Sequence, residues 1–519
     1  MVQRFTDNFE VTWSDPADGQ VTWLYDPMHF PRAMTPLAAE LLRRIYEDFM
    51  SARTVFVNGY AFSTPPTPRP PTPAIMERGI LDVWTKDFQP PIEANARAVR
   101  GADYEHINLP ALGDAVERAV SDSIRAFGYT MEAITGFMGP TFGLVAFLQE
   151  AIGGEGPQLA ASLLQGQENG TAAAGLGLST LVAAAAARPA VADALRAGRF
   201  DSLGSLEGGV EFVALLDKYL DEFGWRAESW GLLNIPTPAE EPRRVLELVA
   251  RYLDEGADNP RAAIGRASEQ REAAMEQIEA RLTPDQRTHL QAMLETTRGH
   301  VPVSEGRALW QLITVGSLRV PALALGRKLV EAGALEEADD AFFLTSEELR
   351  EAAHHPDSAT KELAARRHAE HRRWEKLTPP PFLGPPLDMA ALPPEMVPLV
   401  TLFFGAAPPQ VQGREIKGQA ASRGVVTGRA RVIRDLDDAA RLERGDILVC
   451  QMTAPPWTPL FAIASAVVTD TGGVLSHSAI CAREYGIPCV VATQVGTHMI
   501  ADGATITVDG TAGVVRIEP

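Results

Sequence analysis

The sequence predicts a multidomain protein in which a large, mainly α-helical unit precedes a small α/β domain. Three observations predict this fold class. The chain has 519 residues, its hydrophobic periodicity changes from helical to strand-like after residue 413, and a proline-rich segment separates the two patterns. We expect a mainly helical unit over residues 1–378, a hinge linker over 379–412 and an α/β domain over 413–519.

The long central part of the chain has the pattern of amphipathic helices. Over residues 115–370, apolar residues recur three and four positions apart and β-branched runs are few. The clearest segments are VEFVALLDKYLDEF, PRRVLELVARYL and REAAMEQIEARL. The stretch 171–187 is short and rich in alanine and glycine. We expect it to pack inside a helix bundle, because a membrane span needs about 20 strongly apolar residues.

The next segment, LTPPPFLGPPLDMAALPPEMVPL, is dense in proline. Proline cannot continue a helix and favours extended, semi-rigid conformations, so this segment is predicted to be a hinge. After residue 413 the pattern becomes that of short strands separated by turns and two short helices. The strand-like runs are RARVI, DILVC, SAVVTD, IPCVVA, ATITVDG and GVVRI.

Charge and cysteine content exclude several classes of protein. Lysine plus arginine is 47 and aspartate plus glutamate is 67, which gives a net charge of −20. A protein that binds nucleic acid needs a basic face, so we do not expect a nucleic acid partner. Residues 413–519 hold 10 basic and 11 acidic residues, so 19 of the 20 net charges belong to the preceding part. The start has no apolar run after a basic stretch, and the three cysteines lack metal-ligand spacing. We expect a reduced cytoplasmic chain without a metal site, a membrane partner or a nucleic acid partner.

One segment, VVTDTGGVLSHSAICAREYGIPCVV, has the features of a phosphate site. It predicts a strand ending at Asp470, a turn at Gly472 and Gly473, and a helix that begins beside His477. A helix N-terminus offers free N–H groups to an anion, and glycines let a phosphate approach the backbone. An imidazole with a pKa of about 6.5 keeps a lone pair available for attack at neutral pH. His477 is therefore predicted to accept a phosphoryl group, although a lone histidine at a helix start is more often a capping or surface residue.

The same segment resembles the phosphohistidine signature of the swivelling domain of phosphoenolpyruvate-utilising enzymes. That family includes phosphoenolpyruvate synthase, pyruvate phosphate dikinase and rifampin phosphotransferase. The flanking sequences GQAASRGVVTGRARVI, DILVCQMTAPPWTPLF and DGATITVDGTAGVVRI extend the resemblance over residues 413–519. It implies that His477 is the phosphorylated residue. It also implies a phosphate loop of Thr471, Gly472, Gly473, Ser476, Ser478 and Arg483, although Arg483 could equally form a structural ion pair.

The first 400 residues resemble the acceptor-substrate domain that precedes the histidine domain in this family, including the aryl phosphate synthases. The segments that carry this resemblance are WLYDPMHFPRAMTPL, LDEFGWRAESWGLL with PTPAEEP, SEGRALW and LVEAGALEEADDAFFLTSEEL. Transfer to a hydroxyl requires a base for its proton and a cation for the phosphoryl group. We therefore expect His29 to be the base. The candidate acceptor-binding residues are Asp26, Arg226, Glu305 and Arg307.

The aromatic residues of the N-terminal segment give a weak indication of the acceptor's identity. They fit either an aromatic acceptor site or an ordinary hydrophobic core. These residues are Trp13, Trp23, Tyr25, Phe30, Tyr60 and Phe62.

The resemblance also implies that a nucleotide and a partner subunit take part in the reaction. The chain has no Walker-type glycine loop, and its acceptor-like region begins near Phe9, so we expect ATP and Mg²⁺ to bind to a separate ATP-grasp subunit. The leading hypothesis is a phosphohistidine subunit that transfers a phosphoryl group from ATP to a small phenolic acceptor, as in the degradation of aromatic compounds. The alternatives are a phosphoenolpyruvate synthase-like or antibiotic phosphotransferase component, and a non-catalytic regulatory protein that keeps the phosphohistidine domain.

Overall fold

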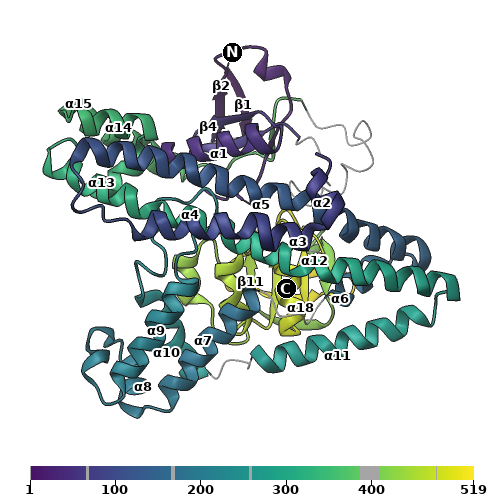
Figure 1. Cartoon of the computed structure of the whole chain (residues 1–519). Helices are drawn as coiled ribbons and strands as arrows, with labels where there is room; N and C mark the ends of the chain where they lie inside the picture. Colours follow the sequence, from purple (N-terminus) through teal and green to yellow (C-terminus); the bar gives the residue numbers. More distant parts are fainter. Residues whose placement is uncertain are drawn as a thin grey trace. The chain divides into compact units, whose positions relative to one another are not determined.

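The protein is described by a computed structural model, shown in Figure 1. The described residues are 2–6, 8–27, 29–65, 69–164, 170–255, 260–385, 410–474 and 476–519. They form two compact units. The first consists of Met1–Gly136, Arg226–Thr237 and Arg307–Val400, and the second of Phe137–Trp225, Pro238–Gly306 and Thr401–Pro519.

The fold is multidomain and largely helical, with an α/β sheet region near the C-terminal end, as the sequence predicts. Residues 386–409, which make up most of the expected hinge, lie outside the described residues. The three-part division at residues 378 and 412 therefore stays a prediction.

The first unit contains two small sheets that the helical prediction did not include. A hairpin of β1 (Val2–Thr6) and β2 (Phe9–Thr12) accompanies a four-stranded antiparallel sheet with the order β4-β5-β3-β6. The strands form because aromatic and β-branched residues, which favour a pleated and buried surface, are concentrated here. All six aromatic residues noted in the N-terminal segment are buried, in agreement with the core interpretation. The strands of the second sheet are β3 (Trp23–Tyr25), β4 (Thr54–Val57), β5 (Tyr60–Ser63) and β6 (Phe382–Leu383).

The helices of the first unit pack around one large apolar core. Two long helices, α5 (Leu109–Ile152) and α12 (Pro284–Ser317), each contribute residues to both units. The remaining helices are α1 (Pro36–Phe49), α2 (Pro73–Arg78), α3 (Ile80–Val83), α4 (Gln89–Gly101), α13 (Arg319–Glu331), α14 (Ser346–His354) and α15 (Ser358–Trp374), with a π-helical turn, η2, over Trp84–Phe88.

The second unit confirms the predicted amphipathic helices. The three segments chosen from the sequence form α9 (Gly209–Phe223), α10 (Arg243–Glu255) and α11 (Pro260–Glu279). The alanine-rich stretch is α7 (Gly170–Ala186), whose Leu178 and Leu181 are buried in a helical core, as expected. The other helices here are α6 (Gly156–Leu163) and α8 (Pro189–Arg196).

A nine-stranded sheet forms the C-terminal part of the second unit. Its order is β7-β8-β15-β14-β10-β11-β12-β13-β9, and the pairs β10–β11, β11–β12 and β12–β13 are parallel. The six strand-like runs form β10 to β15. The three short strands β7 to β9 were not predicted, because their sequences are polar and only three or four residues long. The bounds are β7 (Gln410–Gln412), β8 (Glu415–Lys417), β9 (Gln419–Ser422), β10 (Val425–Val432), β11 (Ile447–Cys450), β12 (Ala466–Thr469), β13 (Cys489–Val491), β14 (Thr505–Asp509) and β15 (Val514–Ile517).

The helices and the sheet of the second unit share one hydrophobic core. A single cluster joins buried residues of α7 to α10 with those of β11, β12, α17 (Thr458–Phe461) and α18 (His477–Tyr485). Polar contacts reinforce this packing, because Arg251 of α10 donates to the Ala439 carbonyl oxygen and Tyr252 donates to the Pro459 carbonyl oxygen. The apolar face of the sheet region is therefore covered by helices from earlier in the chain.

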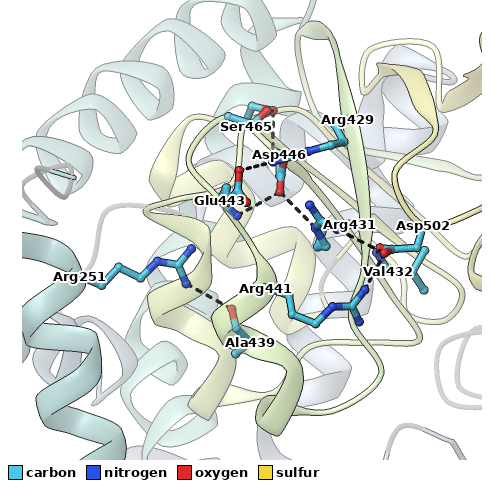
Figure 2. A network of polar contacts seen from close by, with 11 residues as sticks. Arg251, Arg429, Arg431, Val432, Ala439, Arg441, Glu443, Asp446, Ser465 and Asp502 are labelled. Carbon is cyan, nitrogen blue, oxygen red and sulfur yellow. Dashed lines mark hydrogen bonds and ion pairs between the residues drawn. The ribbon is translucent and has the colours of Figure 1, made fainter. Parts of the chain in front are cut away.

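A network of ion pairs fixes one end of the sheet. Figure 2 shows Arg429 and Arg431 of β10 around the Asp446 carboxylate, with Arg429 Nε 2.7 Å from Asp446 Oδ1 and Arg431 Nε 3.4 Å from Oδ2. Asp502 accepts the Val432 N–H at 2.9 Å and pairs with Arg431. Asp446 precedes β11 and Asp502 precedes β14, so the network ties the entries of two strands to β10.

Two helical stretches of the described part are long and apolar enough to cross a membrane by length and composition. They are Leu109–Ile152 and Pro284–Glu331, whose most apolar windows are 28% and 72% buried within the protein. The bent pair Ala173–Ala186 and Pro189–Arg196 would add a third if it were one span. The expected absence of a membrane partner stays a prediction, as does the cytoplasmic localisation.

Candidate functional site

His477 lies at the first residue of α18, where the sequence predicts it. Ser476 caps the helix, since its hydroxyl accepts from the Ala479 N–H, and its own N–H donates to the Gly473 carbonyl oxygen at 2.9 Å. Gly472 has a φ of +99°, and a Cβ there would lie 2.9 Å from Ser476 Oγ. Only glycine fits this close, left-handed turn without strain.

Two residues anchor this loop to neighbouring segments. Thr471 donates from its N–H and its hydroxyl to the Gln451 carbonyl oxygen, at 3.0 and 3.1 Å. The buried Asp470 carboxylate accepts from Thr493 Oγ1 at 3.0 Å and from Thr497 N at 3.1 Å. Burial raises the pKa of Asp470, and the threonine hydrogen bonds partly oppose that rise. The loop that presents His477 is thus fixed from both sides of β12.

Neutral groups contact both nitrogens of the His477 ring. Thr453 Oγ1 lies 2.9 Å from Nδ1, while Thr458 Oγ1 and Cys481 Sγ lie 3.2 and 3.3 Å from Nε2. Phe461 contacts the ring edge-on. The groups at these distances are two hydroxyls and a thiol, which are uncharged hydrogen-bond partners.

Thr453 is itself held by Ser478, the residue after His477. Ser478 Oγ lies 2.8 Å from Thr453 Oγ1 and accepts the Thr453 N–H at 3.3 Å. When the His477 Nδ1–H donates to Thr453 and the Thr453 hydroxyl donates to Ser478, Nε2 keeps its lone pair. The arrangement can therefore select the imidazole tautomer that attacks through Nε2.

Cys481 faces the His477 ring because it follows one helical turn later, at position i+4. Its thiol is fully buried, and burial, followed by Glu484 and Glu305, raises its pKa well above the usual value, so it stays protonated. The sequence analysis treated Cys481 as packing and did not select Thr453 or Thr458. Glu305, one of the predicted acceptor residues, therefore acts electrostatically on this thiol.

Arg483 contacts the sheet, and both its predicted phosphate role and the alternative ion pair stay predictions. It is buried and donates from Nη1 to the Ala421 carbonyl oxygen of β9 at 2.8 Å. Burial lowers its pKa to about 10. Because it lies six positions after His477, helical geometry turns it to a different face of α18. The structure therefore gathers Thr471, Gly472, Gly473, Ser476 and Ser478 at His477 and directs Arg483 to the sheet.

A second histidine centre lies in the first unit. His29 Nδ1 is 2.7 Å from Asp26 Oδ2, and the His29 N–H donates to Asp26 Oδ1 at 3.1 Å. The imidazole stacks on the Trp230 ring with centroids 3.8 Å apart, and Ser229 donates to the His29 carbonyl oxygen. Asp26 is 3% exposed, whereas the His29 side chain retains 16% exposure. This geometry orients an imidazole through a buried carboxylate, as general bases are commonly oriented.

The other candidate acceptor-binding residues lie on different segments of the chain. Arg226 is buried at the start of the segment that carries Ser229 and Trp230. Arg307 donates to Gln311 Oε1 at 3.0 Å, and Gln311 donates to Thr130 Oγ1 at 2.9 Å. Glu305 and Arg307, although two positions apart, belong to different units.

A metal site would require several ligating side chains close together among the described residues. Within them, no three or more histidine, cysteine, aspartate or glutamate side chains gather as metal ligands would.

Comparison with known families identifies the relationship. Residues 442–513, which include the His477 loop, match the model described as PEP-utilising enzyme, mobile domain. Residues 129–305 match the model described as rifampicin phosphotransferase fourth domain. These two matches support the PEP-utilising enzyme family for this chain. The predicted relationship is confirmed.

The relatives that match the chain are much longer than it. A rifampicin phosphotransferase of a Streptomyces species is 31% identical over 422 residues, which cover 79% of this chain and 47% of the relative. An uncharacterised phosphotransferase of Bacillus subtilis is 32% identical over 323 residues, 61% of this chain and 38% of the relative. A chondramide synthase of Chondromyces crocatus is 32% identical over 551 residues, 98% of this chain and 14% of the relative. The chain thus spans less than half the length of these relatives.

Proposed function

We propose that this member of the PEP-utilising enzymes is the phosphohistidine component of an ATP-dependent, dikinase-type phosphotransferase. It would move a phosphoryl group from ATP through His477 to the hydroxyl of a small acceptor. The observation that carries this proposal is the His477 centre itself: a glycine-rich loop, a capped helix N-terminus and an imidazole held by Thr453, all within the matched mobile domain. A capped helix start beside a glycine turn stabilises the anionic phosphoryl group that the histidine would carry.

The transfer to the acceptor divides into balanced bond changes. The acceptor oxygen attacks the phosphorus atom, and a P–O bond forms as the P–N bond to His477 breaks. The electron pair of the P–N bond returns to the ring nitrogen, and the acceptor proton passes to a base. Two positioned steps replace one difficult transfer between ATP and acceptor.

His29 is the proposed base for the acceptor proton. Its contact with the Asp26 carboxylate supports this role, because an Nδ1–H donated to Asp26 leaves Nε2 as the proton acceptor. The carboxylate also stabilises the imidazolium that forms when the proton arrives. Trp230 restricts the ring to one plane by stacking on it. Asp26 therefore acts on the acceptor through His29.

The nucleotide would be bound outside the residues described above. ATP and Mg²⁺ on a separate ATP-grasp subunit is the proposed arrangement, and the charge distribution agrees with a mobile carrier. The His477 domain has a net charge of only −1 over residues 413–519, so it can approach polyphosphate with little long-range repulsion. The titration of the isolated chain with ATP tests this arrangement, because tight binding would contradict it.

A phenolic hydroxyl is the proposed acceptor class. A phenol loses its proton at a pKa of about 10, so a neutral imidazole can remove that proton as the P–O bond forms. The second candidate is an antibiotic hydroxyl. It is favoured by the match of residues 129–305 to a rifampicin phosphotransferase domain and by the relatives of that name.

The deciding experiment combines the purified chain, a family ATP-grasp protein, ATP, Mg²⁺ and a panel of phenols together with rifampicin. We expect AMP and a phosphorylated product to form in equal amounts with one acceptor class. Product from a phenol supports the leading proposal, and product from rifampicin alone supports the second. A stable phosphohistidine that no acceptor discharges would instead support a regulatory, phospho-sensing role.

A further inference from the structure

Tyr46 was not selected from the sequence, yet its hydroxyl reaches the Asp26–His29 pair. We propose that Tyr46 is a positioning residue that sets the basicity of the His29 ring, by donating a hydrogen bond to the same Asp26 oxygen that binds that ring. This inference rests on the proposed function of His29, and it names the group that tunes the base.

The inference depends on one shared oxygen atom. Asp26 Oδ2 lies 2.9 Å from the Tyr46 hydroxyl and 2.7 Å from His29 Nδ1. A carboxylate oxygen that already accepts from a phenol has less negative charge to stabilise an imidazolium. Tyr46 therefore competes with the His29 ring for the charge of one Asp26 oxygen. A base that must also release its proton benefits from this competition.

The donor is held firmly and stays protonated. Tyr46 lies on α1 with 2% of its surface exposed, and its ring packs edge-on against Phe30. Burial, and then Asp26, raises the pKa of Tyr46 well above 10, so the phenol donates at every pH at which the reaction could run. Packing in the large core of the first unit fixes the direction of the hydroxyl.

Other polar groups around the pair have different partners. Tyr25 of β3 interacts electrostatically with Asp26, but its hydroxyl donates to the Phe30 carbonyl oxygen at 2.9 Å, and burial keeps it neutral. Arg32 pairs with Glu375 at 2.7 Å, and His371 of α15 contacts the Ala33 carbonyl oxygen at 2.9 Å. Ser229 and Trp230, which contact His29 directly, do not titrate. Tyr46, in contrast, donates to the same oxygen that holds the His29 ring.

The first test measures His29 without any phosphoryl transfer. The full chain, labelled with ¹³C-histidine and assigned with a His29→Gln spectrum, is titrated by NMR. We expect Tyr46→Phe to raise the pKa of His29 by about 0.4–1 pH unit, the equivalent of one hydrogen bond. Tyr104→Phe is the matched control, because Tyr104 is also buried but donates to the Val99 carbonyl oxygen at 2.8 Å. This control should leave the pKa of His29 unchanged.

A second variant keeps the test decisive if Tyr46→Phe does not fold. Placing 3-fluorotyrosine at position 46 preserves the shape of the side chain and strengthens its hydrogen bond, so the pKa of His29 should fall. An unchanged pKa of His29 in a folded Tyr46→Phe or fluorotyrosine protein would overturn the inference.

The reaction gives an independent readout. Chain phosphorylated in advance is mixed with acceptor at a series of pH values, and the single-turnover rate is measured. The acid limb of the pH–rate profile should shift to higher pH in Tyr46→Phe and to lower pH with 3-fluorotyrosine. If the pKa of His29 moves but the rate profile does not, the proposed role of His29 in the reaction fails. The control of its basicity by Tyr46 would still be supported. The two failures are therefore distinguishable.

Discussion

The two histidine centres differ in the kind of partner that holds the ring. His477 has hydroxyl and thiol groups at its two nitrogens, whereas the Nδ1 atom of His29 contacts a buried carboxylate. Neutral partners leave a nucleophile free to take and release a phosphoryl group, while an anion favours a ring that collects a proton. The contrast agrees with the proposed roles, covalent transfer for His477 and proton transfer for His29.

The largest expected effect comes from removing the proposed phosphoryl carrier, His477. His477→Ala removes the only proposed phosphoryl carrier, so labelling of the chain from [β-³²P]ATP and product formation should both fall to background. Acid-labile label retained in this variant would contradict the assignment. His498→Ala, at an exposed position on the short helix Gly496–Met499, is the matched control and should label normally.

The second effect separates the two half-reactions. His29→Ala should lower the rate of acceptor phosphorylation by roughly 10²–10³-fold, the usual contribution of a general base, while His477 still becomes phosphorylated. The matched control is His106→Ala, because His106 Nδ1 also contacts an aspartate three residues earlier, Asp103, at 2.6 Å but on the exposed surface. Equal loss in both variants, or unchanged transfer in His29→Ala, would remove the proposed base.

The third effect concerns the tautomer at the nucleophile. Thr453→Val keeps the size of the side chain but removes the hydroxyl at Nδ1, so autophosphorylation should slow by about tenfold, the equivalent of roughly 1.4 kcal/mol. Rapid-quench measurement of the phosphohistidine gives this rate. The control is Thr427→Val on β10, whose hydroxyl contacts Thr507 at an exposed site. A rate equal to that of the unmodified chain would show that Nδ1 needs no partner.

The fourth effect is smaller and tests the loop. Gly472→Ala forces a Cβ at φ +99° to within 2.9 Å of Ser476 Oγ, and should lower both autophosphorylation and stability, the latter by about 1–2 kcal/mol. Gly503→Ala, at φ +84° with open space around it, has the same backbone cost without the contact. Thermal unfolding should therefore show a loss of stability in both variants. Phosphohistidine formation should slow only in Gly472→Ala. Equal phosphorylation rates in the two variants would argue against a tight loop.

The smallest effect on activity comes from the ion-pair network of Figure 2. Asp446 is buried, yet hydrogen bonds from Arg429 more than offset burial and lower its pKa. A lowered pKa stabilises the fold above the unfolded-state value of about 3.9 and loses that effect as pH falls through the folded-state value. Asp446→Asn should destabilise the chain by about 1–3 kcal/mol at pH 7.

That difference in stability should narrow below about pH 4, where the unmodified carboxylate also becomes protonated. Denaturant unfolding at several pH values measures it. Autophosphorylation of folded protein should not change. A pH-independent difference would assign the loss to packing and not to charge.

The turn and helix start at His477 were predictable from local sequence because their parts are adjacent. Gly472, Ser476 and His477 lie within one turn and one helix start, and glycine and capping preferences are properties of a few residues. Thr453 lies 24 positions earlier and follows β11, the parallel neighbour of β12. The carboxyl ends of parallel neighbours lie at one edge of a sheet, so a hydroxyl just after β11 was the signal that could have pointed to Thr453.

The acceptor side shows the same limit. Asp26 and His29 were both selected, and they meet because they are three positions apart in one short turn. Tyr46 reaches them from α1 and Trp230 from a distant segment of the chain, so no local pattern in the sequence marks either residue. Pairings of this kind depend on tertiary packing, which local sequence patterns do not specify.

The hydrophobic core that α7 to α10 share with β11, β12, α17 and α18 has a consequence for protein engineering. Grafting residues 413–519 alone onto another acceptor enzyme would leave an apolar face in water, with aggregation as the expected outcome. A working chimera would need to bring helices α7 to α10 with the graft, or replace the apolar side chains of that face with polar ones. The transplantable module is therefore larger than the histidine domain that the sequence delimits.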